Sequence, residues 1–583
     1  MFRNLFQLKK YFVRYKKTFV LGIVFILLSN IGQVYIPQLI KQGINAISSH
    51  AGNGQVLKFV VLITLTTLVA GVFRFLIRQT IIVTSWKIAN DLRYDFWNHL
   101  QKLSLRFYQN NSTGNIMSHA TNDINAVRSF VGPSVMYTID NGTKFLLVFF
   151  IMLSMNPLLT LYALLPSPIM SFLVYFVMSR VHAKYTKIQE KFADLTSRAQ
   201  ENFSGIRVIK SYNREEYETE NYSNESKEYL KRKMDLVKLQ ATFIPVFSII
   251  AGLSFIIVLW AGGTQMINGT FTIGELVAFY AYLGMLIWPM ISFGWVATMV
   301  QQAEASMKRL LKIFNEPYEI QDTDQTKTEI DKIEGEIEFK NVSFKYANNL
   351  PLVLNNINLK IEKGSTVAFI GKTGTGKTSL VNLIPRFYDV TNGEVLIDGE
   401  NVKHIPIETL RKNIGMVSQE NFLFSDTLAN NVTYGLNDEI ENIIHKSAEI
   451  AQLSKDVESF PKGYNTVLGE RGITLSGGQK QRSTLARALA IDPKILILDD
   501  SFSAVDTNTE EEILRRLKEF MKNRTSIIIS HRISTVKDAD KIFVLHEGKI
   551  AEQGTHQELI ELNGIYADLN KRQLLEEELS IMD

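Results

Sequence analysis

The sequence of 583 residues contains no cysteine. That absence excludes disulfide bonds, thiolate metal sites and cysteine nucleophiles. A large excess of charge of either sign is also missing, because 63 Lys and Arg stand against 59 Asp and Glu, for a net charge of +4. A chain so close to neutrality gives no reason to expect a nucleic-acid partner.

Charged residues are scarce as well. They make up 21% of the chain, whereas hydrophobic residues make up 46% and concentrate in the first 300 positions. A chain of this length is too long for one domain. We therefore expect a transmembrane domain over residues 1–312, a charged linker over 313–333 and a soluble domain over 334–583.

Long charge-poor runs indicate six membrane-spanning helices, since a helical crossing needs about 20 apolar residues. The run 145–179 is too long for one crossing and carries the turn signal Met155-Asn156-Pro157, so we interpret it as a hairpin of spans three and four. A large buried helical core is the alternative. The runs are residues 18–40, 58–84, 145–179, 239–274 and 276–303.

Basic residues between the runs predict the orientation. The first 17 residues are basic and lack a cleavage site after the next apolar run, which indicates a retained cytoplasmic flank. Segments 85–132 and 180–238 are rich in Lys and Arg and should face the cytoplasm as long helices that turn near 111–114 and 213–215. The loops near 41–57, 155–157 and 262–274 should face outward.

Four charged residues fall within the predicted spans: Arg74, Arg78, Asp140 and Lys144. Charges inside a membrane segment are candidates for a functional role, here in lining a substrate cavity. A helix end already in cytoplasmic water, or a local ion pair, is the alternative explanation. The sequence leaves both open.

After residue 334 strands and helices alternate, which is typical of an α/β domain with a mostly parallel sheet. Within it, a strand-like run at 365–370 and a helical pattern at 379–384 flank a glycine-rich segment of the form G-x-x-x-x-G-K-[ST]. Such a segment cradles phosphates with its backbone N–H groups, while its Lys reaches the β- and γ-phosphates and its hydroxyl binds Mg²⁺. The segment is Gly371, Lys372, Thr373, Gly374, Thr375, Gly376, Lys377 and Thr378.

Five further signals accompany this loop. An exposed Tyr346 could stack on a purine. Gln419 ends a strand-like run, the stretch 475–479 (Leu-Ser-Gly-Gly-Gln) opens a helix, the buried run 495–500 ends in Asp499 and Asp500, and His531 follows a second buried run.

With these residues in this order, the whole chain resembles an exporter-type half-transporter of the ATP-binding cassette (ABC) family. The resemblance implies an all-α six-helix transmembrane domain followed by an α/β phosphate-loop nucleotide-binding domain. It implies ATP and Mg²⁺ as ligands. Asp499 corresponds to the carboxylate that holds Mg²⁺ through water, Gln419 to the glutamine at Mg²⁺ and water, and His531 to the switch histidine at the γ-phosphate.

The resemblance also implies residues that act across a pair of nucleotide domains. Tyr346 corresponds to the adenine-stacking aromatic residue and Asp506 to an aspartate that crosses the dimer. Glu470 resembles an exporter motif that touches intracellular loops, and residues 114–117 and 205–208 resemble the surroundings of coupling helices. The signature residues Ser476, Gly477, Gly478 and Gln479 form a second phosphate cradle at a helix start. One domain cannot readily clamp one nucleotide with both cradles, so two domains should meet head to tail.

Asp500 departs from the family pattern, in which a glutamate positions the attacking water. Aspartate is one methylene shorter, and a misplacement of about 1 Å can cost on the order of a hundredfold in rate. We expect a slow, degenerate site and hence a heterodimer with a different half-transporter. A homodimer that tolerates aspartate is the alternative.

The sequence thus predicts ATP-driven export of a small amphipathic, drug-like or lipid substrate across a bacterial inner membrane by alternating access. Asp500, His531 and Gln419 are the expected catalytic residues, and Thr378, Gln419 and Asp499 the expected Mg²⁺ ligands. Two alternatives remain, an importer built on the exporter fold and a low-turnover ATP-gated channel or regulator.

Overall fold

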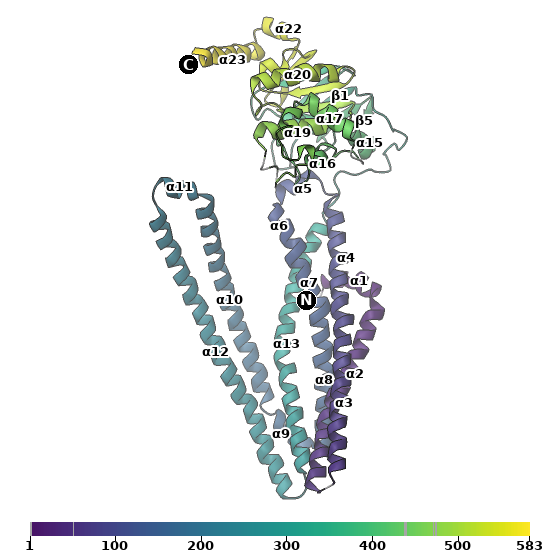
Figure 1. Ribbon diagram of the computed structural model, residues 1–583, viewed down its shortest axis with the longest axis vertical. Coiled ribbons are helices and arrows are strands. Elements are labelled where there is room, and N and C mark those ends of the chain that lie inside the picture. The colour runs from purple at the N-terminus through teal and green to yellow at the C-terminus, as the bar shows by residue number, and fades with distance from the viewer. Residues whose placement is uncertain (1–2, 51, 437–439, 470–471, 473–474, 583) are drawn as a thin grey trace. The chain divides into compact units, whose positions relative to one another are not determined.

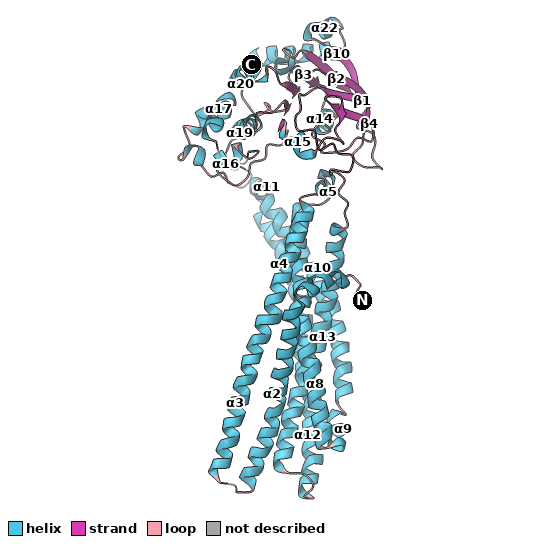
Figure 2. Ribbon diagram, turned by 90° about the vertical axis from the view of Figure 1, so that its right-hand side faces the viewer, coloured by secondary structure: helices cyan, strands magenta, loops and turns pink. Residues whose placement is uncertain are grey.

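The computed structural model describes the whole chain except residues 1–2, 51, 437–439, 470–471, 473–474 and 583. It divides into two compact units, each described here by itself. One comprises residues 1–99 and 113–316 and the other residues 100–112 and 317–583. Strands occur only in the second unit among the described residues (Figures 1 and 2).

The first unit consists of long helices. Several run on through single π-helical turns, so that residues 53–100 and 113–155 each form one continuous helix. Its elements are η1 Leu5–Leu8, α1 Lys9–Arg14, α2 Lys16–Ser48, α3 Asn53–Ile77, η2 Arg78–Ile82, α4 Val83–Leu100, α6 Thr113–Ser118, η3 His119–Asp123, α7 Ile124–Ser129, η4 Phe130–Ser134, α8 Val135–Met155, α9 Pro157–Leu164, α10 Ser167–Ser204, α11 Ile206–Ser211, α12 Glu215–Ile267 and α13 Ile273–Phe314.

Five of these helices are long and apolar enough to cross a membrane: Lys16–Ser48, Asn53–Leu100, Thr113–Met155, Glu215–Ile267 and Ile273–Phe314. The predicted fourth span begins with a shorter apolar stretch, Pro157–Met170. It is interrupted between α9 and α10 at Leu165 and Pro166, a break that we did not predict. Pro166 cannot donate the backbone hydrogen bond that would continue the helix through it.

The apolar helices keep much of their surface exposed. In the most apolar 18-residue stretch of Asn53–Leu100, only 6% of the stretch is buried. Among the five helices the most buried such stretch, in Ile273–Phe314, reaches 39%. Leu57, Leu65 and Leu68 are each more than half exposed. A buried helical core would show the opposite, so that alternative is wrong, and the exposed surface suits contact with lipid.

The turns predicted near 111–114, 155–157 and 213–215 are confirmed, whereas residues 262–267, which we assigned to an outer loop, continue helix α12. α8 ends at Met155, and the side chain of Asn156 caps α9 by accepting a hydrogen bond from the Leu159 N–H at 2.9 Å. Helices α12 and α13 are joined through residues 268–272, where Thr272 and Glu275 form a capping box. Residues 212–214 separate α11 from α12.

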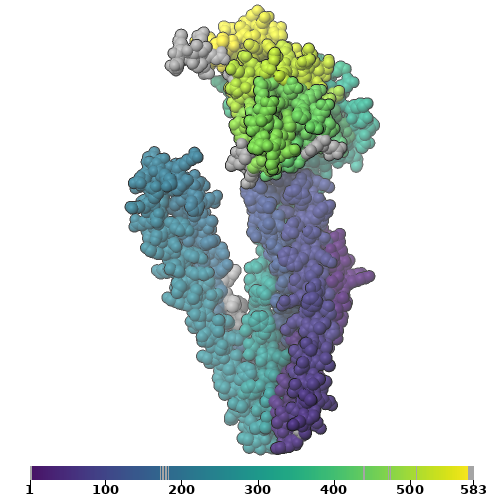
Figure 3. Space-filling model, viewed as in Figure 1, coloured from purple at the N-terminus to yellow at the C-terminus, as the bar shows by residue number. Residues whose placement is uncertain are grey.

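Helices α10 and α12 run side by side and are joined by α11, so that residues 167–267 form an arm (Figure 1). Toward its α11 end the arm stands apart from α13 and the other helices of the unit (Figure 3). Lys191 of α10 bridges to Glu225 and Glu228 of α12 and holds the two helices together.

Arg74, Asp140 and Lys144 each have a polar contact within the unit. The Arg74 guanidinium donates to Gln33 Oε1 at 2.9 Å, and Lys144 Nζ lies 3.6 Å from Asp140 Oδ2 one turn away. Lys144 is buried, whereas Arg74 and Arg78 are exposed. The contact between Asp140 and Lys144 agrees with the local ion pair that we considered.

The second unit contains two sheets. A six-stranded sheet has the order β10-β9-β3-β8-β7-β6, in which β9, β3, β8, β7 and β6 are parallel, and a four-stranded antiparallel sheet has the order β2-β1-β4-β5. The mostly parallel sheet was predicted, and the antiparallel sheet was not. The strands are β1 Ile337–Phe344, β2 Leu354–Ile361, β3 Thr366–Ile370, β4 Asn392–Ile397, β5 Glu400–Asn401, β6 Ile414–Val417, β7 Ile495–Asp499, β8 Thr525–Ile529, β9 Lys541–His546 and β10 Lys549–Gly554.

Helices cover the parallel sheet, and two cores meet at it. Successive residues of a strand point to opposite faces. Accordingly, Leu496 and Leu498 of β7 enter one core, and Ile495 and Ile497 enter the other. The helical elements are α5 Leu105–Asn110, α14 Lys377–Asn382, α15 Ile407–Lys412, α16 Leu428–Val432, α17 Glu441–Ile450, α18 Ser454–Val457, η5 Gly463–Asn465, α19 Gly477–Ala490, α20 Thr507–Met521, α21 Ile533–Val536, α22 His556–Glu561 and α23 Ile565–Met582.

Helix α5 belongs to the second unit although it lies far from it in sequence. The Gln109 amide donates to the Tyr388 hydroxyl at 2.7 Å, and Ser104 and Arg106 both contact Glu319. The segment just before residues 114–117 therefore packs on the α/β domain.

Candidate functional site

The glycine-rich loop connects β3 to α14, which begins at Lys377. A Cβ on Gly371 would lie 2.3 Å from the carbonyl oxygen of Leu545, so only glycine fits there. Gly374 and Gly376 have φ angles of +85° and +100°, which glycine adopts without strain. The loop therefore curls at the carboxyl edge of the parallel sheet, in front of a helix N-terminus that favours anions.

Lys377 lies across this loop. Its Nζ donates to the carbonyl oxygens of Gly371 at 2.7 Å and Lys372 at 2.9 Å. Burial lowers the pKa of Lys377, and the nearby carboxylates of Asp499 and Asp500 oppose that change. The ammonium group thus sits where a phosphate in the loop would meet it.

Asp499 ends β7 with only 1% of its surface exposed. Its Oδ2 atom is buried and has no hydrogen-bond partner in the described part of the chain. Burial raises the pKa of Asp499, and a hydrogen bond from Thr378 acts in the opposite direction. An orphaned carboxylate oxygen beside a hydroxyl is a donor set that suits Mg²⁺. These residues fit the predicted metal.

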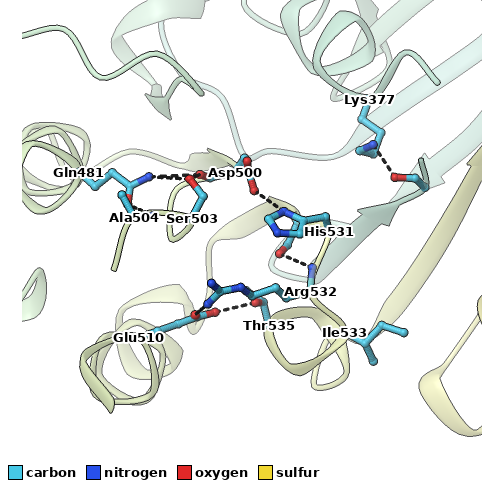
Figure 4. A network of polar contacts seen from close by, with 12 residues as sticks. Lys377, Gln481, Asp500, Ser503, Ala504, Glu510, His531, Arg532, Ile533 and Thr535 are labelled. Carbon is cyan, nitrogen blue, oxygen red and sulfur yellow. Dashed lines mark hydrogen bonds and ion pairs between the residues drawn. The ribbon is translucent and has the colours of Figure 1, made fainter. Parts of the chain in front are cut away.

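Asp500 and His531 face each other at the end of the sheet (Figure 4). His531 Nδ1 lies 3.0 Å from Asp500 Oδ1, and the Asp500 N–H donates to the Ile529 carbonyl at 2.9 Å. Asp500 has φ of +50°, a left-handed conformation that aspartate adopts more readily than most residues. The side chain of His531 is 58% exposed and that of Asp500 22%, so the histidine is the more accessible of the two.

One cavity of about 340 Å³ gathers most of the predicted site residues. Its lining includes Tyr346, Thr373, Gly374, Gly376, Lys377, Thr378, Gln419, Asp499, Asp500 and His531. Gly371, Lys372 and Thr375 do not line it, although Gly371 and Lys372 hold the Lys377 ammonium.

Tyr346, which closely follows β1 in the chain, lines the cavity. Its hydroxyl lies 2.8 Å from Ser379 Oγ, and its ring meets the Tyr388 ring edge-on with centroids 5.4 Å apart. These contacts fix the orientation of a half-buried aromatic ring beside the phosphate loop. Gln419, which follows β6, is exposed and lines the cavity, as predicted.

The signature residues lie elsewhere. Ser476 caps α19, and its hydroxyl and the Gln479 side chain form a reciprocal capping box. Gly477 is exposed, and Gly478 approaches Ala504 so closely that a Cβ would lie 3.0 Å from its carbonyl oxygen. None of Ser476, Gly477, Gly478 and Gln479 lines the cavity of the phosphate loop.

Two further residues were predicted to act between domains. Asp506 caps α20 by accepting a hydrogen bond from the Thr509 N–H at 3.0 Å. Glu470 lies outside the described residues.

Sequence reasoning missed several polar residues that hold the site in shape. Gln481 donates to Ser503 Oγ at 3.0 Å and accepts from the Ala504 N–H at 2.9 Å, and so fixes the turn after Asp500. Glu510 binds both Arg532 and Thr535, which belong to the segment that follows His531 (Figure 4). Their contacts span about 20 residues or more, so no local motif could have revealed them.

An arrangement of membrane-length apolar helices and an α/β domain with a phosphate loop defines the class of nucleotide-driven membrane transporters. Two family descriptions match this chain: "ABC transporter transmembrane region" at residues 19–290 and "ABC transporter" at residues 354–503. The chain belongs to the ABC transporters, and within them to the exporter type. It is therefore a multi-pass membrane protein that binds and hydrolyses ATP.

Relatives match the chain almost from end to end. It is 34% identical to the multidrug resistance-like ATP-binding protein MdlA of Buchnera aphidicola subsp. Schizaphis graminum, over 98% of this chain and 99% of that protein. It is 36% identical to an ATP-dependent lipid A-core flippase of Syntrophus aciditrophicus, over 85% and 82%. A solved bacterial Atm1-family ABC exporter with ATP bound has a TM-score of 0.79 at 26% identity and covers 96% of this chain and 98% of that one.

Proposed function

We propose that this protein exports a small amphipathic, drug-like or lipid molecule by alternating access, driven by ATP. The observation that carries the proposal is a nearly complete phosphate cavity in the same chain as helices of membrane length. The relatives named for multidrug resistance and for lipid A-core flipping support this substrate class. Basic residues in segments 85–132 and 180–238 support an inner-membrane protein whose nucleotide domain is cytoplasmic.

Each site residue has a proposed role. The backbone of residues 371–378 holds the phosphates, Lys377 gives up its carbonyl contacts to neutralise them, and Tyr346 packs against the base. Thr378, Gln419 and Asp499 hold Mg²⁺, which when bound offsets the negative charge that develops on the phosphates. Asp500 orients the attacking water, and His531 donates a hydrogen bond to the γ-phosphate.

The site is incomplete in one chain. Ser476, Gly477, Gly478 and Gln479 form a second anion cradle that lies off the cavity of their own phosphate loop. We propose that a second half-transporter supplies this cradle, head to tail, so that each ATP is buried between two nucleotide domains. The arm formed by residues 167–267, which stands apart at its α11 end, supports a partner that packs along it (Figure 3).

We propose further that the partner is a different half-transporter. Asp500 places its carboxylate one methylene closer to the backbone than a glutamate would, and it already contacts His531 at 3.0 Å. A water positioned for a longer side chain would then lie out of reach, so hydrolysis at this site is slow. A second ATP would then be bound between the partner's phosphate loop and Ser476 and Gly477 of this chain, and it would be hydrolysed there.

The test is the ATPase rate of the chain purified alone in lipid, beside Asp500→Glu and, as a size-matched control, Asp500→Asn. We expect low activity in the wild type, a gain of about tenfold or more in Asp500→Glu and no gain in Asp500→Asn. Brisk wild-type hydrolysis that Asp500→Glu does not improve would establish a working homodimer and refute the heterodimer.

Transport direction needs a separate measurement. In inside-out vesicles, an exporter moves a fluorescent amphipathic dye inward when ATP is added outside, and Lys377→Ala abolishes that movement. Dye movement only in right-side-out vesicles loaded with ATP would indicate an importer. A voltage-dependent ion current without dye movement would indicate an ATP-gated channel.

A further inference from the structure

The C-terminal helix α23 is hydrogen-bonded to the segment that carries His531. The side-chain amide of Gln573 donates from Nε2 to the carbonyl oxygen of His531 and accepts from the N–H of Ile533 at 2.8 Å. One carboxamide thereby uses both of its ends on the two peptide groups that flank Arg532. The contact spans about 40 residues of sequence.

This pattern reproduces what a neighbouring strand would offer. A strand donates to the carbonyl of one residue and accepts from the N–H two residues further on. Strand β8 has already ended at Ile529. Gln573 therefore supplies, from a side chain, the backbone support that the sheet no longer gives at His531.

Further contacts hold the rest of the segment. The Arg532 N–H donates to Ser530 Oγ at 3.0 Å, and Arg532 Nη1 and Thr535 Oγ1 reach Glu510 at 2.6 and 2.7 Å (Figure 4). On another side the segment borders a cavity of about 880 Å³, whose lining includes His531, Arg532 and Gln573. Ile533 and Val536 are anchored in the core, whereas His531 is exposed on the cavity side, so hydrogen bonds add to packing in fixing the backbone at His531.

We call the two hydrogen bonds of Gln573 to the His531 carbonyl and the Ile533 N–H the Gln573 clamp. Helix α23, which carries Gln573, is itself anchored to the domain. The N–H groups of Ile565 and Tyr566 at its start donate to the Glu552 carboxylate. Tyr566 is fully buried, and its hydroxyl contacts His556 Nδ1 at 2.7 Å. Gln573 lies two turns further along the same helix, so its amide is held relative to the domain core.

We propose that Gln573 is a positioning residue for ATP hydrolysis, which acts by holding the backbone of His531. The imidazole of His531 lies 3.0 Å from Asp500, and its reach toward a γ-phosphate depends on where the His531 carbonyl and the Ile533 N–H are fixed. Gln573 itself touches no substrate. The inference rests on the proposed function, in which His531 contacts the γ-phosphate.

The test compares Gln573→Ala, which removes both bonds, with Gln573→Glu, which keeps an acceptor for the Ile533 N–H but turns a carboxylate toward the His531 carbonyl. Arg572→Ala is the matched control, because the Arg572 side chain pairs with Asp568 on its own helix at 2.9 Å. Steady-state ATPase kinetics and hydrogen exchange of residues 531–536 are measured on the full-length chain in lipid, with every variant made in the Asp500→Glu background, in which this chain's own site is expected to turn over.

We expect Gln573→Ala and Gln573→Glu each to lower kcat about tenfold with KM for ATP within about twofold, because phosphate binding is intact and only the switch residue is displaced. Exchange of the Ile533 amide should accelerate about tenfold in Gln573→Ala and stay slow in Gln573→Glu. Arg572→Ala should change neither quantity.

The proposal is overturned if kcat is unchanged in both Gln573 variants, or if KM rises while kcat does not. It is also overturned if Arg572→Ala matches Gln573→Ala, since a general loosening of α23 would then explain the effect. An Asp500→Glu chain without any ATPase activity would refute the proposed function instead. The exchange rates of Ile533 would still decide whether the clamp exists.

Discussion

Glu510 offers the most direct test of how the switch segment is stabilised. It lies in the first turn of α20, where a negative charge is favourable, and is 4% exposed. Its two oxygens bind Arg532 Nη1 at 2.6 Å and Thr535 Oγ1 at 2.7 Å. Replacement by alanine removes both bonds at once and leaves the buried Thr535 hydroxyl without that acceptor.

The expected loss can be worked out from these contacts. A hydrogen bond that involves a charged group is worth about 1.5–3 kcal/mol. The side chain of Arg532 is 36% exposed and regains water when its partner is lost, so its bond belongs at or below the low end of that range. We therefore expect Glu510→Ala to destabilise the second unit by about 3 kcal/mol, which corresponds to a decrease in Tm of about 6–12 °C for a domain of this size.

Calorimetry of the full-length protein is the suitable assay. The chain has five tryptophans, and all of them lie between residues 86 and 295, so tryptophan fluorescence does not report on the second unit. Glu511→Ala is the matched control, since Glu511 is the neighbouring exposed residue and its loss should change stability by no more than about 0.5 kcal/mol. A Tm change in Glu510→Ala no larger than that in Glu511→Ala would refute the reasoning.

Three further predictions concern the phosphate site and the membrane unit. Because burial raises the pKa of Asp499 above 3.8, the folded unit binds that proton more tightly than the unfolded chain, so metal-free stability should fall as pH rises above 3.8. Mg²⁺ should raise Tm more at high pH than at low pH, and Asp499→Asn should abolish both trends in a calorimetric pH series. Lys377→Ala should weaken binding of a fluorescent ATP analogue by about 10- to 100-fold, because it removes a charge-assisted phosphate contact; an unchanged affinity would contradict this. Asn156→Ala should lower the stability of the membrane unit by about 1–2 kcal/mol through loss of the α9 cap, with a decrease in Tm by tryptophan fluorescence that Asn156→Asp, which keeps the acceptor, should largely avoid.

Some elements were predictable because their signals are local. The spacing of Gly371, Gly376 and Lys377 encodes a turn, a helix start and a cation within eight residues, and the structure has a tight loop at that place. The Asn156-Pro157 dipeptide likewise predicted the hairpin, because a capping side chain and a proline at the first helical position define a helix start.

Other elements were not predictable, because the same local pattern occurs in more than one kind of structure in this chain. The break at Leu165 and Pro166 was missed, since proline is tolerated inside other helices of this chain, for example Pro289 in α13. The antiparallel sheet was missed as well, because Ile337 of β1 pairs with the distant Ile397 of β4 and short apolar runs do not reveal their partners.

By itself, the sequence determined the membrane-length helices, the alternating α/β domain and the chemistry of the phosphate loop, because each depends on the period or spacing of neighbouring residues. Only the tertiary structure decided that Lys377, Asp499 and His531 share one cavity while Ser476 lies off it. It alone brought Gln573 to His531, across about 40 residues. Such contacts form when distant elements pack against the sheet, and no periodicity along the chain encodes which side chains will meet there.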